Sequence, residues 1–158
     1  MTYPVVLPLL TPSEAVTDPV YRALLGIDKY DIAMFNSAFV GDNLHFELRN
    51  NDTNAIESVS AWRKELLEHL GPMDTTHTLS NVRVYVEEGS NNASLTASIL
   101  AQHALPGQGK DPSSPKFLVG AQYEVDLVKD QADGLWKIRK WLVDIIWSQG
   151  DASIMPKH

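Results

Sequence analysis

Two periodicities divide the chain into an N-terminal and a C-terminal part. In the N-terminal part, apolar residues recur at the three- and four-residue spacing of amphipathic helices. These residues are Val20, Ala23, Leu24 and Ile27 in one stretch and Ile56, Val59, Trp62, Leu66, Leu67 and Leu70 in another. From about residue 76 onward, apolar and polar residues alternate, which is the period of a half-buried strand. The pattern therefore predicts helices first and strands afterwards.

The ends of the helices carry recognisable signals. The first twelve residues predict an extended arm, and Thr17-Asp18-Pro19 is typical of a helix start, with a capping side chain and a proline in the first turn. A short second helix is expected over residues 31–39. Residues 50–54 predict a turn, in which Asn54 caps the next helix. Gly71-Pro72 ends that helix.

The C-terminal half predicts a meander of long strands. The expected strands cover residues 76–86, 95–105, 117–127 and 135–147, with a flexible loop at 106–115 and a hairpin turn at Asp133-Gly134. Helices followed by consecutive antiparallel strands indicate an α+β fold, in which the helices pack on one face of a curved sheet. We expect a single domain over residues 1–158, made of an arm (1–12), a core (13–150) and a tail (151–158).

Composition narrows the range of functions. The 158 residues suit one domain that is large enough for a core and a pocket. A net charge of −7 and the lack of a basic run argue against nucleic acid as a partner. The chain has no cysteine, so it offers no disulfide and no thiolate zinc site. MTYPVVLPLL lacks a basic start and no apolar run is long enough to span a membrane, so we expect a cytoplasmic protein whose sequons at Asn51 and Asn92 stay unused.

Three widely separated polar residues, Asp28, His77 and His103, fall where the patterns predict burial. A carboxylate and imidazoles that meet in a cavity can move protons near neutral pH without a cofactor. Each also has a plain structural interpretation: Asp28 could face water, and either histidine could be a satisfied core residue. His77 faces inward together with the valines of its strand only if a bulge lies between them. The same three side chains would also be a sound metal ligand set.

Other residues are candidates for contact with a ligand. The ring of Tyr123 shares its strand face with apolar residues, so its hydroxyl would point into the same volume. Trp62, Trp141 and Trp147 are expected as core or pocket walls. The chain has no GxSxG, Walker, GxGxxG or HExxH motif, and neither a metal nor a cofactor is expected.

The joint order of these features resembles a known family. Asp28 within GIDKYDIAMFNSAF, His77 at a strand start, His103 deep in the next strand and the closing GLWKIRKWLVDIIW carry the resemblance. They are similar to the SnoaL-like branch of the nuclear-transport-factor-like superfamily, and most similar to scytalone dehydratase-like proteins. The resemblance covers residues 20–150. It implies a cone-shaped fold in which N-terminal helices and the curved sheet enclose one pocket, and pairing into homodimers through the open face of the sheet, which would include Trp141.

The resemblance also implies roles for individual residues. Asp28 would pair with His77 as a catalytic dyad, His103 would contact a substrate oxygen or leaving hydroxyl, and Tyr123 would anchor the ligand. Ile27 and Leu48 stand where scytalone dehydratase has two tyrosines that hold a water, so the pocket would be more apolar. A cofactor-free dehydratase, isomerase or cyclase for a polyketide- or terpenoid-derived metabolite is implied. The alternatives are a non-catalytic small-molecule-binding module and a hydrolase of an epoxide or lactone.

Overall fold

The computed structural model describes residues 4–50, 52–56 and 58–155, and among these the side chains of 52–56, 59 and 62–64 are not described. The elements run in the order α1 (Pro12–Asp28), α2 (Ile32–Ser37), β1 (His45–Asn50), β2 (Asp52–Ile56), α3 (Val59–His69), β3 (Asp74–Val86), β4 (Asn92–Ala104), β5 (Lys116–Lys129), β6 (Trp136–Gly150) and a 3-10 turn η1 (Ala152–Ile154).

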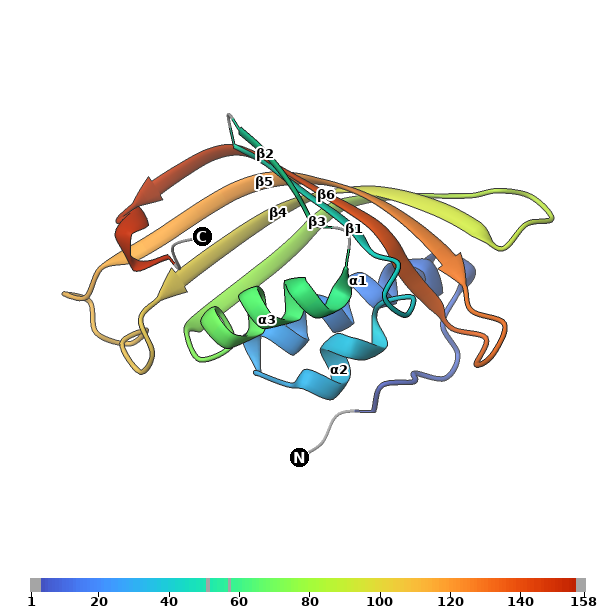
Figure 1. Ribbon diagram of the computed structural model, residues 1–158, viewed down its shortest axis with the longest axis horizontal. Coiled ribbons are helices and arrows are strands. Elements are labelled where there is room, and N and C mark those ends of the chain that lie inside the picture. Colours follow the sequence, from blue (N-terminus) through green and yellow to red (C-terminus); the bar gives the residue numbers. More distant parts are fainter. Residues whose placement is uncertain (1–3, 51, 57, 156–158) are drawn as a thin grey trace.

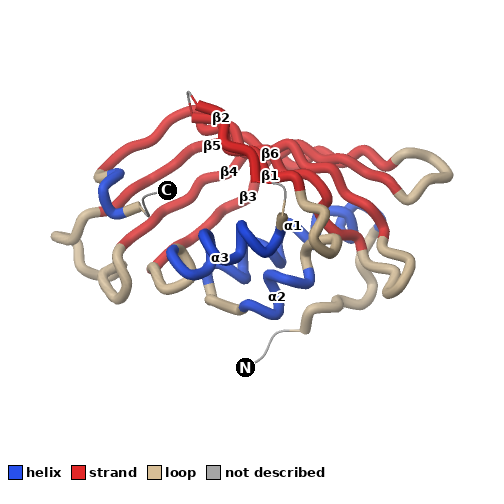
Figure 2. The backbone as a smooth tube through the Cα atoms, in the orientation of Figure 1, coloured by secondary structure: helices blue, strands red, loops and turns tan. Residues whose placement is uncertain are grey.

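The strands form one mixed sheet in the order β2-β1-β6-β5-β4-β3, in which only the β1–β6 pair is parallel among the described strands. The sheet arches over the three helices, which lie together on its concave side (Figure 1). Figure 2 shows the same two layers, with the strands above and the helices below. The predicted α+β architecture, a curved and mainly antiparallel sheet packed on N-terminal helices, is confirmed.

Helix α1 begins earlier than the sequence predicts. Thr11 is its N-cap: its hydroxyl accepts a hydrogen bond from the N–H of Glu14, whose carboxylate accepts one from the N–H of Thr11. This capping box and Pro12 in the first turn satisfy the free N–H groups of the helix start. The predicted start at Thr17-Asp18-Pro19 is wrong. The chain has a second threonine–proline start signal at Thr11-Pro12, and only this one is completed by a capping box. Pro19 is buried inside the helix.

The segment expected as a turn before α3 is mostly strand. Residues 52–56 pair with β1, with Leu48 opposite Asn54. The N-cap of α3 is Ser58, whose hydroxyl accepts from the N–H of Ala61. The prediction that Asn54 caps this helix is therefore wrong. Its polar run suited a loop, but β2 is an edge strand, where polar residues are tolerated.

A bulge in β3 puts two runs of opposite parity on the same face. The register against β4 shifts between Ser80 and Arg83, and Asn81 has φ of 52°. Asparagine is one of the few residues that adopts this left-handed conformation readily. Because of the extra residue, His77 and Val84 both face the helices. The bulge that the sequence analysis required is present.

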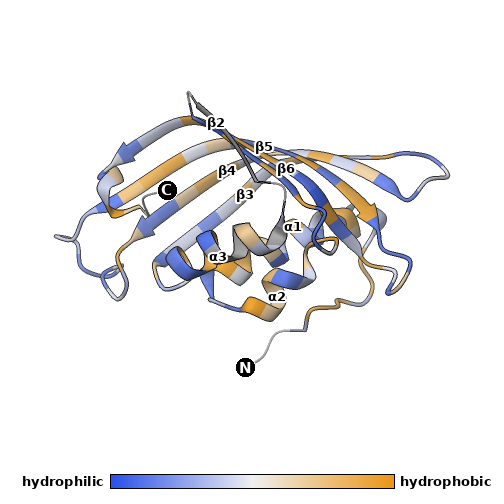
Figure 3. Ribbon diagram, viewed as in Figure 1, coloured by the Kyte–Doolittle hydropathy of each residue, from blue (hydrophilic) through white to orange (hydrophobic). Residues whose placement is uncertain are grey.

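The core lies between the concave face of the sheet and the helices. Figure 3 shows apolar and polar residues alternating along β4 and β5, as expected when one face is covered and the other is open. The largest fully buried side chains are Trp141, Phe35, Leu44, Leu127, Ile138, Val16, Val20, Val125 and Pro19. The buried guanidinium of Arg22 joins α1 to its surroundings, since it donates to Asp18, Ser37 and the Trp136 carbonyl.

Candidate active site

The end of α1 and the start of β3 meet at Asp28, the last residue of the helix. Asp28 Oδ1 lies 2.6 Å from His77 Nδ1, and Oδ2 accepts the backbone N–H of His77 at 2.9 Å. The hydroxyl of Thr75 donates to Oδ1 at 2.8 Å. The carboxylate is therefore held by three hydrogen bonds from a single strand, and it fixes the ring of His77 in place.

The pair is largely shielded from solvent, with side-chain exposures of 8% for His77 and 15% for Asp28. Burial raises the pKa of Asp28, but the hydrogen bond and positive charge of the His77 ring, with the bonds from the His77 N–H and Thr75, outweigh it and leave the pKa lowered. Asp28 is therefore a carboxylate at neutral pH and can only accept. In the neutral form of His77 the proton resides on Nδ1, and Nε2 presents a free lone pair.

His103 is the second histidine on the concave face, and its side chain is held by the backbone. Its Nδ1 lies 3.1 Å from the carbonyl oxygen of Phe117 on β5. A carbonyl only accepts, so Nδ1 carries the proton and Nε2 is again a lone pair. Burial, helped by the nearby His77, lowers the pKa of His103 to about 4 despite the bond to Phe117. His103 is therefore neutral at physiological pH.

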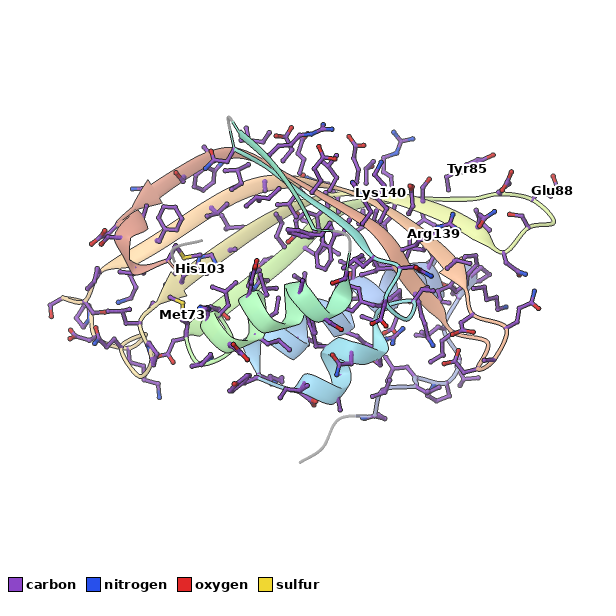
Figure 4. The ribbon with its side chains drawn as sticks, in the orientation of Figure 1. Met73, Tyr85, Glu88, His103, Arg139 and Lys140 are labelled. Carbon is purple, nitrogen blue, oxygen red and sulfur yellow. The ribbon has the colours of Figure 1, made fainter. Side chains whose placement is uncertain are left out.

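The two histidines are neighbours on adjacent strands. Their ring centroids lie 5.7 Å apart with the planes almost perpendicular, at 89°. His103 is paired with Thr75 across the β3–β4 ladder, and His77 with Ala101. Figure 4 shows His103 on the helix side of the sheet near Met73, whereas Tyr85 stands on the opposite side. The arrangement presents two imidazole lone pairs within the span of a small molecule.

Tyr123 lies further along β5 on the same face. Its side chain is 5% exposed and packs edge-on against Trp141, with ring centroids 5.1 Å apart. Burial and the negative charge of Asp28 both raise the pKa of its hydroxyl, so it is protonated and able to donate. Val119 is the register partner of Ala101, which in turn pairs with His77. Tyr123 lies four residues beyond Val119, so Tyr123 and His77 are about 13 Å apart along the strand direction, at 3.3 Å per residue.

Three of the apolar residues that were expected to line the pocket lie in or against the core. Ile27 is buried at the end of α1, Leu48 is partly buried against the core, and Trp141 is buried at 1% exposure among aromatic rings. Trp62 belongs to α3, but its side chain lies outside the described residues.

Trp147 does not join the site. The β5–β6 register shifts between Gly120 and Ala121, and the additional residue Ile146 turns Trp147 outward, where it is 46% exposed and its indole lies across Gly120. Strict alternation from Trp141 would have kept Trp147 inward, so the prediction that it lines the pocket fails because of this bulge.

Other polar groups lie away from the dyad. His45, Glu47 and Arg49 interact with one another on β1, with Glu47 Oε1 2.7 Å from Arg49 Nε. Within the described residues, no three histidine, aspartate or glutamate side chains are grouped so that they could hold a metal ion together.

Two hydrogen-bond partners at the site were not predicted from the sequence. Thr75 lies two residues before His77 on the same strand face, so its parity could have revealed it. The carbonyl of Phe117 belongs to the backbone, and no residue type signals its role.

The protein thus has a cone-like α+β fold with a partly buried carboxylate–imidazole pair on its concave face. The SnoaL-like domain family matches residues 9–142. This chain therefore belongs to the SnoaL-like family, and the predicted family is confirmed. It is 38% identical over 150 residues to terrestric acid biosynthesis cluster protein E from Penicillium crustosum, covering 95% of this chain and 93% of that protein.

Solved structures share the fold at lower identity. One is a provisionally named scytalone dehydratase from Novosphingobium aromaticivorans, with a TM-score of 0.70 and 20% identity, covering 85% of this chain and 84% of that one. Another is hexachlorocyclohexane dehydrochlorinase LinA-type3 from Novosphingobium barchaimii, with a TM-score of 0.66 and 18% identity, covering 91% and 92% of the two chains. Among the described residues, no helix is both long and apolar enough to cross a membrane.

Proposed function

We propose that this protein is a cofactor-free acid–base enzyme, a dehydratase or isomerase, that acts on a small polyketide- or terpenoid-derived metabolite in secondary-metabolite biosynthesis. One observation carries the proposal: a partly buried Asp28 carboxylate lies 2.6 Å from His77 Nδ1, and in the neutral ring this leaves a free lone pair on Nε2. The similarity to a biosynthesis cluster protein supports the metabolic setting.

In this proposal, His77 Nε2 removes a proton from a carbon next to a carbonyl group. The imidazolium that forms is stabilised by the ionised Asp28, and Thr75 keeps the carboxylate in position. General acid–base catalysis of this kind contributes about 10²- to 10⁴-fold to a rate.

His103 assists by accepting a hydrogen bond from the substrate rather than by donating one. Its Nδ1 proton is engaged by Phe117, so its Nε2 suits a hydroxyl group of the substrate. With the two rings 5.7 Å apart, a C–H bond at His77 and a hydroxyl at His103 fit neighbouring carbon atoms of one molecule. In a dehydration, the C–H and C–O bonds break, a C=C bond forms, and the His77 imidazolium returns its proton to the leaving hydroxyl, which departs as water.

The surroundings favour a largely apolar ligand. Ile27 directly precedes Asp28 and is buried, and Trp141 and Leu48 belong to or pack against the same apolar core on the concave side of the sheet. The hydroxyl of Tyr123 would anchor the far end of the ligand by donating a hydrogen bond. We therefore expect a second polar group on the substrate, about 13 Å from the reacting carbon along the direction of β5.

The test uses solvent deuterium. The protein is incubated in D₂O with a panel of small polyketide-type β-hydroxy ketones and lactones, and NMR follows both deuterium uptake next to the carbonyl and release of water. Wild-type protein should catalyse uptake for at least one compound, and His77→Ala should lose about 10²- to 10⁴-fold of that rate while staying folded.

His45→Ala is the matched control, since His45 also has a carboxylate neighbour, Glu47, but its side chain is 40% exposed. It should leave deuterium uptake unchanged. Uptake that survives in His77→Ala contradicts the proposal. A compound that binds tightly and is returned undeuterated by wild-type protein would instead support a binding module. Incorporation of ¹⁸O from labelled water into the product would identify a hydrolase.

Two further expectations accompany the proposal. A homodimer is still predicted, although Trp141 faces the core and cannot lie on the surface through which subunits would pair. Sedimentation equilibrium at several concentrations would determine the subunit number. A cytoplasmic location also stays a prediction.

A further inference from the structure

The end of α1, where Asp28 lies, has an unusual residue in its closing turn. The N–H of Tyr30 donates to the carbonyl of Ile27 at 3.0 Å. The N–H of Asp31 donates to the carbonyl of Gly26 at 2.8 Å. These two bonds form a Schellman motif, in which the residue at Tyr30 must adopt a left-handed conformation.

Tyr30 has φ of 52°, which places an L-residue with a bulky ring where glycine is preferred. Glycine would close the same helix at a lower conformational cost. Non-glycine residues held in this region persist where the surrounding structure determines their position, and they are frequent at functional sites. Stability of the helix end alone therefore does not account for a tyrosine here.

The ring of Tyr30 has a specific contact. It lies against Gly71, in the turn between α3 and β3, so closely that a Cβ on Gly71 would be 2.3 Å from Cδ2 and 2.5 Å from Cε2 of the ring. Tyr30 as a whole is 47% exposed to solvent. From Gly71 the chain runs only four residues to Thr75 and six to His77.

Two bridges thus join the same two segments. One is polar, from Asp28 to Thr75 and His77. The other is a packing contact, from Tyr30 to Gly71. We propose that Tyr30 is a positioning residue, whose ring holds the end of α1 at the distance from β3 that lets Asp28 reach His77 Nδ1. This inference rests on the proposed function, because it assigns Tyr30 a role in maintaining the proposed catalytic pair.

The positioning role predicts that removing the ring lowers activity without lowering stability. Tyr30→Gly removes the ring and relieves the left-handed strain, so the melting temperature should stay the same or rise. With the packing bridge gone, kcat should fall roughly 10- to 100-fold with KM unchanged, since small displacements of reacting groups have effects of this size. Tyr30→Phe keeps the ring and should behave as wild type. Gly71→Ala is unsuitable, because its Cβ would also lie 2.5 Å from the Leu67 carbonyl oxygen.

The measurement that does not depend on turnover is ¹H–¹⁵N NMR of the histidine side chains. The wild type should show a strongly downfield, exchange-protected Nδ1 proton for His77, assigned by its loss in His77→Ala. Tyr30→Gly should shift that signal upfield or broaden it beyond detection, and Tyr30→Phe should retain it. If Tyr30→Gly does not fold, Tyr30→Asn serves instead, since asparagine tolerates the left-handed region without supplying a ring.

An unchanged His77 signal and unchanged kcat in a folded ring-less variant would overturn the positioning role. So would a fall in melting temperature that accounts for the whole loss of activity, because Tyr30 would then only stabilise the fold. The proposed function is tested separately: if His77→Ala keeps its deuterium uptake, the catalytic proposal fails, while the NMR signal still reports whether Tyr30 positions the pair.

Discussion

The two halves of the candidate site use the same side chain in different surroundings. On the α1–β3 side, His77 is held by the carboxylate of Asp28, and on the β4–β5 side His103 is held by the carbonyl of Phe117. Both rings are buried and both carry the proton on Nδ1. A carboxylate stabilises the protonated ring, whereas a neutral carbonyl in a buried site does so only weakly. The partner, and not the residue type, therefore makes one histidine suited to be a base and the other a neutral acceptor.

The halves also differ in what holds them. The partner of His77 is a side chain from another element, so a single substitution can remove it. The partner of His103 is backbone, set by the register in which His103 faces Phe117 across the ladder. Substitutions can therefore test the two halves independently.

The largest expected effect follows from changing the partner of His77. In Asp28→Asn, the amide oxygen is needed by the backbone N–H of His77, so the NH₂ group faces Nδ1 and favours the tautomer with the proton on Nε2. The base is then lost, and deuterium uptake should fall by about 10³- to 10⁴-fold with the fold retained.

Asp126→Asn, at an exposed carboxylate on β5, is the control and should keep full activity. Wild-type uptake in Asp28→Asn would mean that the carboxylate does not set the tautomer of His77, and the contrast between the halves would disappear.

The His103 half is expected to have a smaller effect, which appears in how the free energy of unfolding depends on pH. The pKa of His103 is about 4 in the folded protein against an ordinary value of 6.5, so between these values the unfolded chain binds more protons. Stability should therefore be constant above pH 6.5 and decrease as the pH falls toward 4, by up to about 3 kcal/mol from this residue.

Urea unfolding from pH 7 to 4 measures this loss. His103→Asn, whose NH₂ group takes the place of Nδ1 and can still donate to Phe117, should lose less stability than wild type over that range. Equal pH dependence in both proteins would contradict the assignment of His103 as a buried neutral ring. Asp28 does not confuse the measurement, because its pKa is lowered and its contribution is lost only at still lower pH.

The smallest effect is expected at Tyr123, which lies further along β5 than either half and takes part in neither hydrogen-bond network. Tyr123→Phe keeps the ring against Trp141 and removes one hydrogen-bond donor. KM should rise about 3- to 10-fold with kcat nearly unchanged, as for the loss of one neutral hydrogen bond that binds substrate and transition state equally. A large fall in kcat with constant KM would instead place the hydroxyl at the reacting atoms.

Local pattern was sufficient for much of the fold. Helical spacing followed by alternation identified the helices, the strands and the α+β class, because burial of one face imposes a period that the residues must follow. It failed where two signals competed, as at the start of α1, and where a polar segment became an edge strand, as at Asn54.

For the site, the sequence by itself determined which chemistry is possible: a carboxylate, two histidines and a tyrosine on the buried positions of separate elements. The tertiary structure decided which of them meet and on which face they lie. One bulge brings His77 to the helix side and another turns Trp147 away from it, since a single extra residue reverses the facing of a strand. The proton positions on the two rings were likewise decided by partners distant in the chain.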